Sequence, residues 1–277
     1  MVLTQQIVYK QIEDLKEMQD VVYFQEEIWG NAVVTPLPQL IAASHHGGII
    51  IGAFNEGELI GFTYGFSGYK NEEHYLISHM TGVRQNYQNY GIGLNLKLKQ
   101  RELAIEYGYK NIKWTFDPLE ARNAYFNLNK LGAYAKTYFN SYYGEMGDKL
   151  NTGLPSDRFL VEWDICSNRV TEALFGPQKG SSFKNYHPLL TWSDFGDIPL
   201  PLDEKPIENE IGYLVPVPAN FQSLKQVDNG AAKAWRYKFR NVVSKAISKG
   251  YKVTGIIKNT TNVHFYIIEN NVEALHD

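Results

Sequence analysis

Two closely spaced glycines, Gly91 and Gly93, are the residues most suited to chemistry in this sequence. They lie between a predicted strand that ends at Val83 and a predicted helix that starts at Gly91. Glycine lets the backbone approach a ligand without a clash from Cβ. The first amides of a helix lack internal partners and carry the positive end of its dipole. The pattern predicts a pyrophosphate site, and the alternative is a plain tight turn.

His79 and Asp117 are candidates for the chemistry beside this turn. His79 lies in the strand before it, at the even spacing that predicts the same face as Thr81 and Val83. Histidine exchanges protons near neutral pH, so His79 is a candidate general base; the alternative is a hydrogen-bonded core histidine. Asp117 follows the next strand, at the edge where open α/β sheets bind ligands. Its alternative is an aspartate that forms a turn before Pro118.

Arg158 is a weaker candidate. Its guanidinium is suited to holding a substrate carboxylate, and the alternative is a surface ion pair with Asp157. His45 and His46 have no further ligand at metal-binding spacing, so we predict no metal site.

Composition restricts the class of protein. The chain has 277 residues, 44% hydrophobic and 21% charged, with a net charge of -3 and a single cysteine, Cys166. These values are ordinary for a globular protein and give no reason to expect nucleic acid or a membrane as a partner. No signal peptide or membrane span is apparent, so we expect a cytoplasmic protein. The oligomeric state is not indicated.

Hydrophobic periodicity predicts alternating strands and helices in the first part of the chain. Helix 91–107 has two apolar stripes, so we expect it to be covered on more than one side. One stripe consists of Leu94, Leu98 and Ile105, and the other of Leu96, Leu103 and Tyr107. The predicted elements are strand 7–11, helices 13–29 and 39–44, strands 49–54, 59–66 and 75–83, helix 91–107, strand 111–116, helix 119–131, and extended segments 133–143 and 158–165.

The strand, turn and helix around Gly91 resemble motif A of the GNAT superfamily of acyl-CoA N-acyltransferases. Gln88, Gly91 and Gly93 match its pattern of Gln or Arg, two residues, Gly, one residue, and Gly or Ala. Segments 116–124 and 126–132 further resemble a predicted-acetyltransferase subgroup. The resemblance spans about residues 7–165.

That resemblance implies a mixed sheet flanked by helices, with the fourth and fifth strands splayed around the pantetheine arm. It implies acetyl-CoA or another acyl-CoA as co-substrate. Asn123, at the start of the helix after Asp117, is a candidate contact of the CoA arm, and the alternative is a local helix cap. The residues expected to bind the pyrophosphate are Val83, Gln88, Asn89, Tyr90, Gly91, Ile92 and Gly93.

Three departures from the family pattern concern the acid, a nearby aromatic position and the anion site. Leu128 replaces a tyrosine that often protonates the leaving thiolate, and Ala133 replaces an aromatic residue. The loop also has no Lys or Arg between Gln88 and Gly93. Other possible proton donors are Tyr125, Tyr142 and Tyr143.

The sequence predicts three parts: an acyl-CoA-binding domain at 1–166, an irregular connection at 167–209 and a small α/β domain at 210–277. The last part has few elements for an independent core, so we expect it to pack on the first. Its helix 231–249 carries basic residues, including Arg236 and Arg240, which we interpret as a solvated face.

The predicted function is acyl transfer from CoA to an amine of a small-molecule or peptide acceptor. The alternatives are a non-catalytic acyl-CoA sensor and a protein-interaction module.

Overall fold

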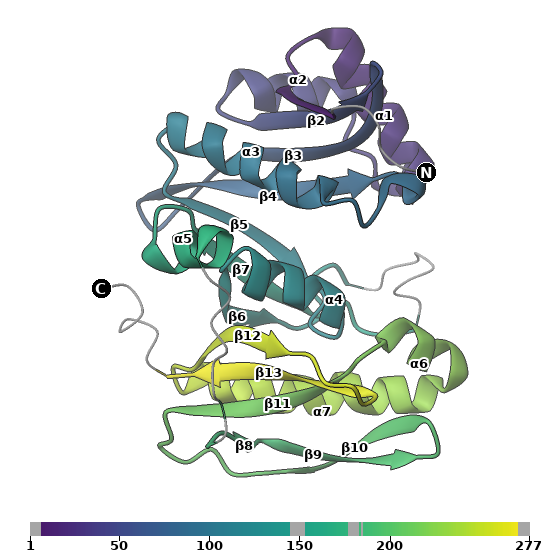
Figure 1. Cartoon of the computed structure of the whole chain (residues 1–277), viewed down its shortest axis with the longest axis vertical. Coiled ribbons are helices and arrows are strands. Elements are labelled where there is room, and N and C mark those ends of the chain that lie inside the picture. Colours follow the sequence, from purple (N-terminus) through teal and green to yellow (C-terminus); the bar gives the residue numbers. More distant parts are fainter. Residues whose placement is uncertain (1–6, 145–152, 177–182, 184, 271–277) are drawn as a thin grey trace. The chain divides into compact units, whose positions relative to one another are not determined.

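The computed structural model describes residues 7–144, 153–176, 183 and 185–270. The chain divides into two compact units, residues 1–114 and 115–277 (Figure 1). The domain boundaries predicted at 166/167 and 209/210 stay predictions. Residues 1–6, on which the signal-peptide prediction rests, lie outside the described residues.

In its described residues, the first unit contains five strands in the order β1-β2-β3-β4-β5. β1 to β4 are antiparallel neighbours, and β5 is parallel to β4, so this sheet is mixed. The elements are β1 (Val8–Gln11), α1 (Leu15–Trp29), η1 (Asn31–Val33), α2 (Leu37–His45), β2 (Ile49–Asn55), β3 (Glu58–Lys70), β4 (Glu73–Val83), η2 (Gln85–Tyr87), α3 (Ile92–Glu106) and β5 (Asn111–Phe116), the last of which crosses into the second unit.

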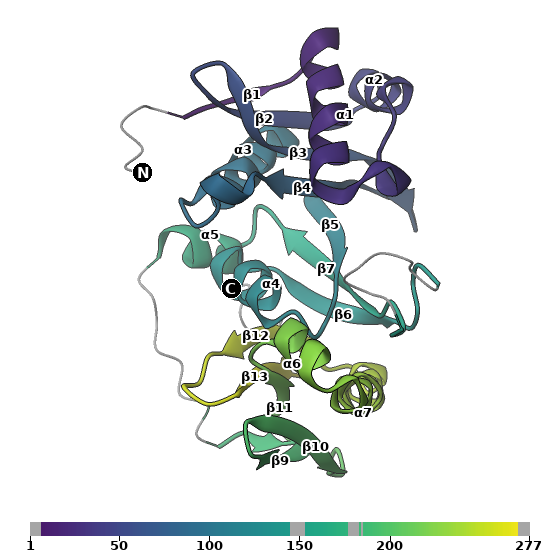
Figure 2. The same cartoon turned by 90° about the vertical axis from the view of Figure 1, so that its right-hand side faces the viewer.

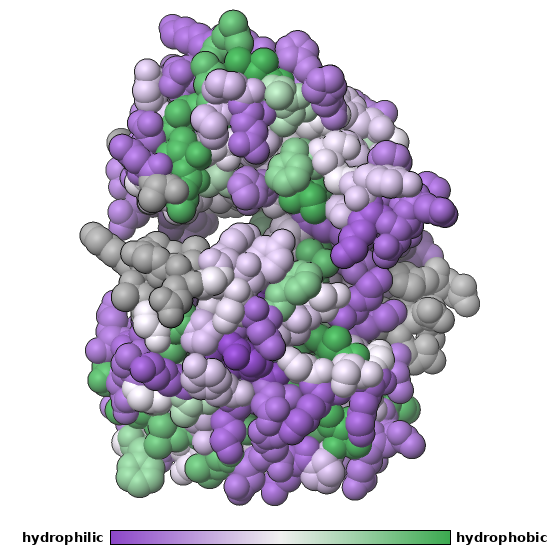
Figure 3. Space-filling model, turned by 180° about the vertical axis from the view of Figure 1, so that it is seen from behind, coloured by the Kyte–Doolittle hydropathy of each residue, from purple (hydrophilic) through white to green (hydrophobic). Residues whose placement is uncertain are grey.

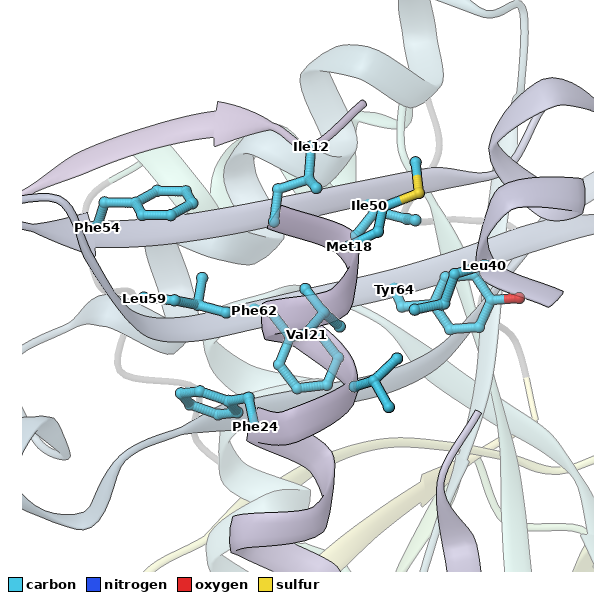
Figure 4. Packing of buried hydrophobic residues seen from close by; sticks show 11 residues of the cluster. Ile12, Met18, Val21, Phe24, Leu40, Ile50, Phe54, Leu59, Phe62 and Tyr64 are labelled. Carbon is cyan, nitrogen blue, oxygen red and sulfur yellow. The ribbon is translucent and has the colours of Figure 1, made fainter. Parts of the chain in front are cut away.

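Helices cover both faces of this sheet. Figure 2 shows α1 and α2 on one side of β2, β3 and β4, and α3 on the other. Asp14 caps α1 by accepting hydrogen bonds from the amides of Lys16 and Glu17, and Gly30 ends the helix with a φ of 77°. The core between α1, α2 and the sheet is shown in Figure 4 and includes Ile12, Met18, Val21, Phe24, Leu40, Ile50, Phe54, Leu59, Phe62 and Tyr64.

The buried face of α3 differs from the stripes that periodicity suggests. Ile105 and Tyr107, one from each predicted stripe, are exposed, whereas the polar Lys97 and Gln100 are buried. Leu96 and Leu103 of the second predicted stripe are buried as expected, whereas the apolar stripes missed the buried Lys97 and Gln100. The residues of α3 that face inward are Ile92, Leu96, Lys97, Gln100, Leu103 and Ala104.

The part of the second unit that the structure describes contains six strands in the order β7-β6-β12-β13-β11-β8 and a separate hairpin of β9 and β10. The elements are α4 (Ala121–Ala124), the π-helical η3 (Tyr125–Lys130), β6 (Tyr134–Phe139), β7 (Arg158–Asp164), α5 (Asn168–Phe175), β8 (His187–Pro188), β9 (Leu190–Phe195), β10 (Ile198–Glu204), β11 (Gly212–Pro218), α6 (Phe221–Val227), α7 (Asn229–Ser248), β12 (Lys252–Ile257) and β13 (Val263–Glu269).

The predicted irregular connection is largely structured, because it holds α5 and strands β8 to β10. The β9–β10 hairpin turns at Gly196, which has a φ of 64°. Pro199 and Pro201 in β10 hide this strand from sequence reasoning, since proline is confined to edge strands and bulges. Residues 177–182 and 184 of this segment lie outside the described residues.

The C-terminal part packs on residues 115–165, as the sequence predicts. The Phe159 ring lies 6.2 Å from that of Phe239 and 5.7 Å from that of Tyr266, measured between centroids. The Tyr266 hydroxyl donates to the Pro118 carbonyl at 2.6 Å, and α7 also packs against β6. These aromatic contacts join the C-terminal part to residues 115–165 in one compact unit.

The predicted α/β class is confirmed: a mixed sheet flanked by helices, followed by a further strand-rich region. On the face in Figure 3, apolar side chains form separate small groups among hydrophilic ones. None of the helices in the described ranges is both long and apolar enough to cross a membrane.

Candidate active site

The glycine turn lies where the sequence predicts it, between β4 and α3. Gly91 is the N-cap of α3 and has a left-handed φ of 79°, which glycine adopts without strain. A Cβ at Gly91 or Gly93 would meet no atom within 4 Å. The first bond of the helix joins the Asn95 amide to the Gly91 carbonyl at 3.0 Å. In the described residues, the amides at 91–93 have no protein acceptor, so the turn has donors and room for an anion.

Side chains around the turn hold its shape. The Gln88 side-chain amide donates to the Val83 carbonyl at 3.2 Å, which ties the turn to the end of β4. Arg84, the nearest preceding cation in the sequence, pairs with Glu27 at 3.2 Å and with Glu58. Arg84 is therefore already neutralised, and the amides are the donors that the turn offers to an anion.

β4 and β5 pair over only a short stretch of the first unit. Their parallel pairing joins Leu76 to Ile112 and Ile77 to Lys113. By contrast, β3 and β4 pair along their length, as far as Val83. Within the first unit as described, the edge of β4 after Ile77 is thus not paired with β5, which agrees with the splayed strands that the resemblance implies.

His79 occupies a β-bulge in β4. The pairing with β3 passes from Tyr64↔Met80 to Gly65↔Ser78, so His79 is the extra residue. The bulge reverses the predicted face: the His79 ring makes edge contacts with Tyr64 and Phe66, on the side of α1 and α2.

Thr81, which simple alternation places beside His79, lies on the other side of the strand. Its hydroxyl is 2.8 Å from that of Thr63, which accepts from Gln100 on α3. The prediction that His79 and Thr81 share a face is therefore wrong, because one inserted residue shifts the alternation. His79 is exposed rather than in the core, and burial of part of its ring lowers its pKa from 6.5.

Sequence reasoning missed Lys97, the most deeply buried cation of the first unit as described. Its side chain is 3% exposed, and Nζ donates to Ser78 Oγ at 2.8 Å and to Gln100 Oε1 at 2.9 Å. Nζ also lies 4.0 Å from the centroid of the Trp114 ring. Burial lowers the pKa of Lys97 to about 7. The available signal was its position one residue after Leu96 on the inward stripe of α3.

Asp117 has partners within the second unit. Its two carboxylate oxygens accept from Arg236 on α7 at 2.8 and 2.6 Å, and one also accepts from the Leu119 amide at 2.8 Å. The bond to Leu119 matches the turn-forming alternative. His79 and Asp117 belong to different units, and their roles as candidates for the chemistry beside the turn stay predictions.

Arg158 and Asp157 are both buried, so the alternative of a surface ion pair is wrong. Asp157 instead binds Arg240 of α7 through two bonds of 2.8 and 2.6 Å. Arg158 donates to the Asp157 carbonyl at 2.8 Å and lies 3.7 Å from Asp117. Its role in holding a substrate stays a prediction.

The prediction that the basic residues of helix 231–249 form a solvated face is wrong for two arginines of α7. Arg236 is 1% exposed and Arg240 is bound to a fully buried carboxylate, so neither belongs to a solvated basic face. Local helix spacing could not reveal this, because the carboxylates come from residues 117 and 157.

Leu128 lies in the core at 1% exposure, within the π-helical segment η3. The sequence predicts an ordinary helix here, and a π turn adds one residue to the repeat. The three tyrosines predicted as other possible proton donors each contact another side chain. The Tyr125 ring centroid is 3.7 Å from Lys258 Nζ, Tyr142 stacks on Phe139, and the Tyr143 hydroxyl is 3.2 Å from Thr115 Oγ1.

Two remaining predictions concern CoA contact and metals. Asn123 is exposed on α4, and its role as a CoA contact stays a prediction. In the described ranges, no group of three or more His, Cys, Asp or Glu residues is placed to hold a metal ion.

Comparison with known proteins supports the resemblance. Residues 12–132, less than half of the chain, match the model of the acetyltransferase (GNAT) family. No curated protein matches the chain.

Three solved structures illustrate the similarity. An acetyltransferase of the GNAT family from Streptococcus pneumoniae is 16% identical with a TM-score of 0.45, over 57% of this chain and 98% of that one. Naa50 from Arabidopsis thaliana, in complex with the bisubstrate analogue CoA-Ac-MVNAL, is 17% identical with a TM-score of 0.44, over 56% and 97%. YncA, a putative acetyltransferase from Salmonella typhimurium with acetyl-CoA, is 13% identical with a TM-score of 0.47, over 58% and 95%.

The glycine turn belongs to the segment that the family model matches, and this segment includes residues of both units. Residues 12–132 therefore match the acetyltransferase (GNAT) family, and the glycine turn lies within this matched segment.

Proposed function

We propose that this protein transfers an acyl group, acetyl in the simplest case, from acyl-CoA to an amine. The observation that carries the proposal is the open glycine turn at the start of α3, in the segment that matches the GNAT family, beside the edge of β4 that does not pair with β5 in the described residues. The acceptor is a small molecule or a peptide, and the protein needs no metal for this chemistry.

The pyrophosphate of CoA is proposed to bind the amides of Gly91, Ile92 and Gly93. Space at both glycines and unused donors at the positive end of a 15-residue helix support this placement. The other residues proposed to contact CoA are Val83, Gln88, Asn89, Tyr90 and Asn123.

In the proposed reaction, the acceptor nitrogen attacks the thioester carbonyl and loses a proton to His79. An exposed histidine whose pKa is lowered from 6.5 is neutral at pH 7, as a base must be. Backbone amides on the free edge of β4 stabilise the oxyanion. Asp117 is the second candidate for this chemistry, but its bonds to Arg236 favour a structural role.

A binding experiment tests the CoA site directly. Gly93→Glu adds a carboxylate where the pyrophosphate is proposed to lie. The new side chain meets no atom at Cβ, and glutamate is favoured in the first turn of a helix, so the fold should survive. We expect calorimetry to show acetyl-CoA affinity at least about tenfold weaker, or ~1.4 kcal/mol.

Gly57→Glu is the matched control. Gly57 also has open space around Cβ, but it lies in the β2–β3 turn with a φ of 83°. Its substitution should leave acetyl-CoA affinity unchanged. Unchanged affinity in a folded Gly93→Glu variant would exclude the proposed site.

A turnover experiment separates the proposal from its alternatives. Release of CoA from acetyl-CoA is measured with a panel of small primary amines and peptides. Amine-dependent release supports the enzyme. Binding without release for any amine favours the non-catalytic sensor, and absence of acetyl-CoA binding favours the protein-interaction module.

A further inference from the structure

Lys97 lies at the point where β4 and β5 part. Ser78 directly follows the last β4 residue of their pairing, and Trp114 directly follows the last β5 residue. Lys97 Nζ contacts both, at 2.8 Å from Ser78 Oγ and 4.0 Å from the centre of the Trp114 ring. The amine therefore lies between the first residues of the two diverging strands.

A polar network holds this amine in place. Gln100 accepts from Lys97 at 2.9 Å and donates to Thr63 at 3.3 Å, and the Thr63 hydroxyl is 2.8 Å from that of Thr81. Lys97, Ser78, Gln100 and Thr63 are all buried. A buried amine costs stability, and groups with such shifted pKa values gather at functional sites.

We infer that Ser78 and Lys97 together supply the proton that the CoA sulfur takes as it leaves. The inference rests on the proposed acyl transfer and assigns the role that Leu128 cannot fill. Ser78 is the residue that touches the sulfur. Lys97 acts through the Ser78 hydroxyl and is in this sense a positioning residue.

The acyl transfer exchanges one bond of the carbonyl carbon for another and moves protons through Ser78, Lys97 and His79. The acceptor nitrogen bonds to the carbonyl carbon, the carbon–sulfur bond breaks, and its electron pair stays on sulfur. The Ser78 hydroxyl gives its proton to sulfur and takes one from the Lys97 ammonium. The proton of the acceptor passes to His79, and Lys97 regains a proton from solvent after the products leave.

The bulge in β4 places the two proton-transfer groups on opposite sides of one strand. Ser78 points to Lys97 and α3, whereas the neighbouring His79 contacts Tyr64 and Phe66 on the side of α1 and α2. A base for the incoming amine and an acid for the outgoing thiolate are then separated by the strand itself, which prevents them from neutralising each other.

Among the described residues, charged groups on the elements around Lys97 lie on another face or have partners of their own. On β4, His79 is on the opposite face. On β5, Lys113 is directed to Glu73, at 4.0 Å, and to the Tyr75 ring. On α3, Lys99 pairs with Glu102 at 2.6 Å. Burial is the cause that lowers the pKa of Lys97 to about 7, a value at which it can both give and regain a proton near neutrality.

The test measures the pKa of the thiol of bound CoA, from the ultraviolet absorbance of the thiolate across pH. CoA itself is the probe, so no acceptor is needed. Because Ser78 and Lys97 stabilise the thiolate, we expect this pKa to be about one unit lower in the wild type than in Lys97→Met. Ser78→Ala should raise it likewise, and Lys99→Met should match the wild type.

The outcomes distinguish the inference from the function on which it rests. CoA that binds with the same thiol pKa in the wild type, Lys97→Met and Ser78→Ala overturns the inference. A wild type that does not bind CoA in calorimetry overturns the proposed function itself.

Turnover provides a second readout. With an acceptor that supports CoA release, Lys97→Met should lower kcat by about 10²-fold at unchanged CoA affinity. It should also lose the fall in kcat above pH ~7 that deprotonation of Lys97 causes. A kcat and pH profile equal to those of Lys99→Met would contradict the assignment.

Discussion

Two clusters of buried ionisable groups lie in different units and are built in opposite ways. In the lysine cluster of Lys97, Ser78, Gln100 and Thr63, the cation donates to neutral oxygens. The arginine cluster of the second unit joins carboxylates and guanidiniums directly and consists of Asp117, Asp157, Arg158, Arg236 and Arg240.

The difference lies in what each cluster can do. Paired opposite charges stay ionised, hold fixed geometry and tie distant segments together, as Arg236 ties α7 to the end of β5. An amine held by neutral oxygens loses its charge easily, and burial lowers the pKa of Lys97 to about 7. The first arrangement suits architecture, and the second suits proton transfer.

The largest expected effect breaks the arginine cluster. Arg236→Met leaves the Asp117 carboxylate in a buried site without its bidentate partner, which should cost ~3–5 kcal/mol of unfolding free energy. Urea unfolding measures it, with the exposed Lys233→Met as the control on the same helix. The double variant Asp117→Asn/Arg236→Met should lose less than the sum of the single variants. A strictly additive result would show that the pair is not coupled.

The next expected effect is a dependence of the unfolding free energy on pH, caused by Lys97 of the lysine cluster. The pKa of Lys97 is about 7 in the fold and 10.5 for an ordinary lysine. Between these values the unfolded chain binds a proton that the folded chain lacks. The wild type should therefore gain up to about 1.4 kcal/mol per pH unit relative to Lys97→Met as pH rises through this window.

Unfolding of the two proteins at pH 7 and at higher pH measures this gain. We expect Lys97→Met to be the more stable at pH 7, because it removes a buried ionisable group, and the gap to narrow with rising pH. A difference in unfolding free energy between the two proteins that does not change with pH would mean that Lys97 stays charged in the folded protein, as the arginines do.

The smallest expected change in unfolding free energy comes from a surface ion pair, which serves as the reference for both buried clusters. Lys99 and Glu102 form an i,i+3 pair at 2.6 Å on the exposed side of α3. Lys99→Met should change the unfolding free energy by less than ~0.5 kcal/mol, since such pairs are screened by solvent. A loss similar to that of Arg236→Met would remove the distinction between buried and surface pairs.

The sequence by itself determined the local features of the candidate site. Gly91 and Gly93 specify an open turn at the helix start, because Gly91 takes a left-handed φ of 79° without strain and both glycines leave the Cβ space empty. Strand and helix periods likewise predicted β4, α3, β5 and α7, since these depend on residues a few positions apart.

Only the tertiary structure decided which side chains meet. One inserted residue in β4 moved His79 to the face opposite Thr81, and no local pattern marks such a bulge. Lys97 has a charged side chain, yet it is buried because α3 packs against the strands of the first unit. Arg236 and Asp117 are 119 residues apart in sequence, so their pairing depends on chain folding and not on spacing.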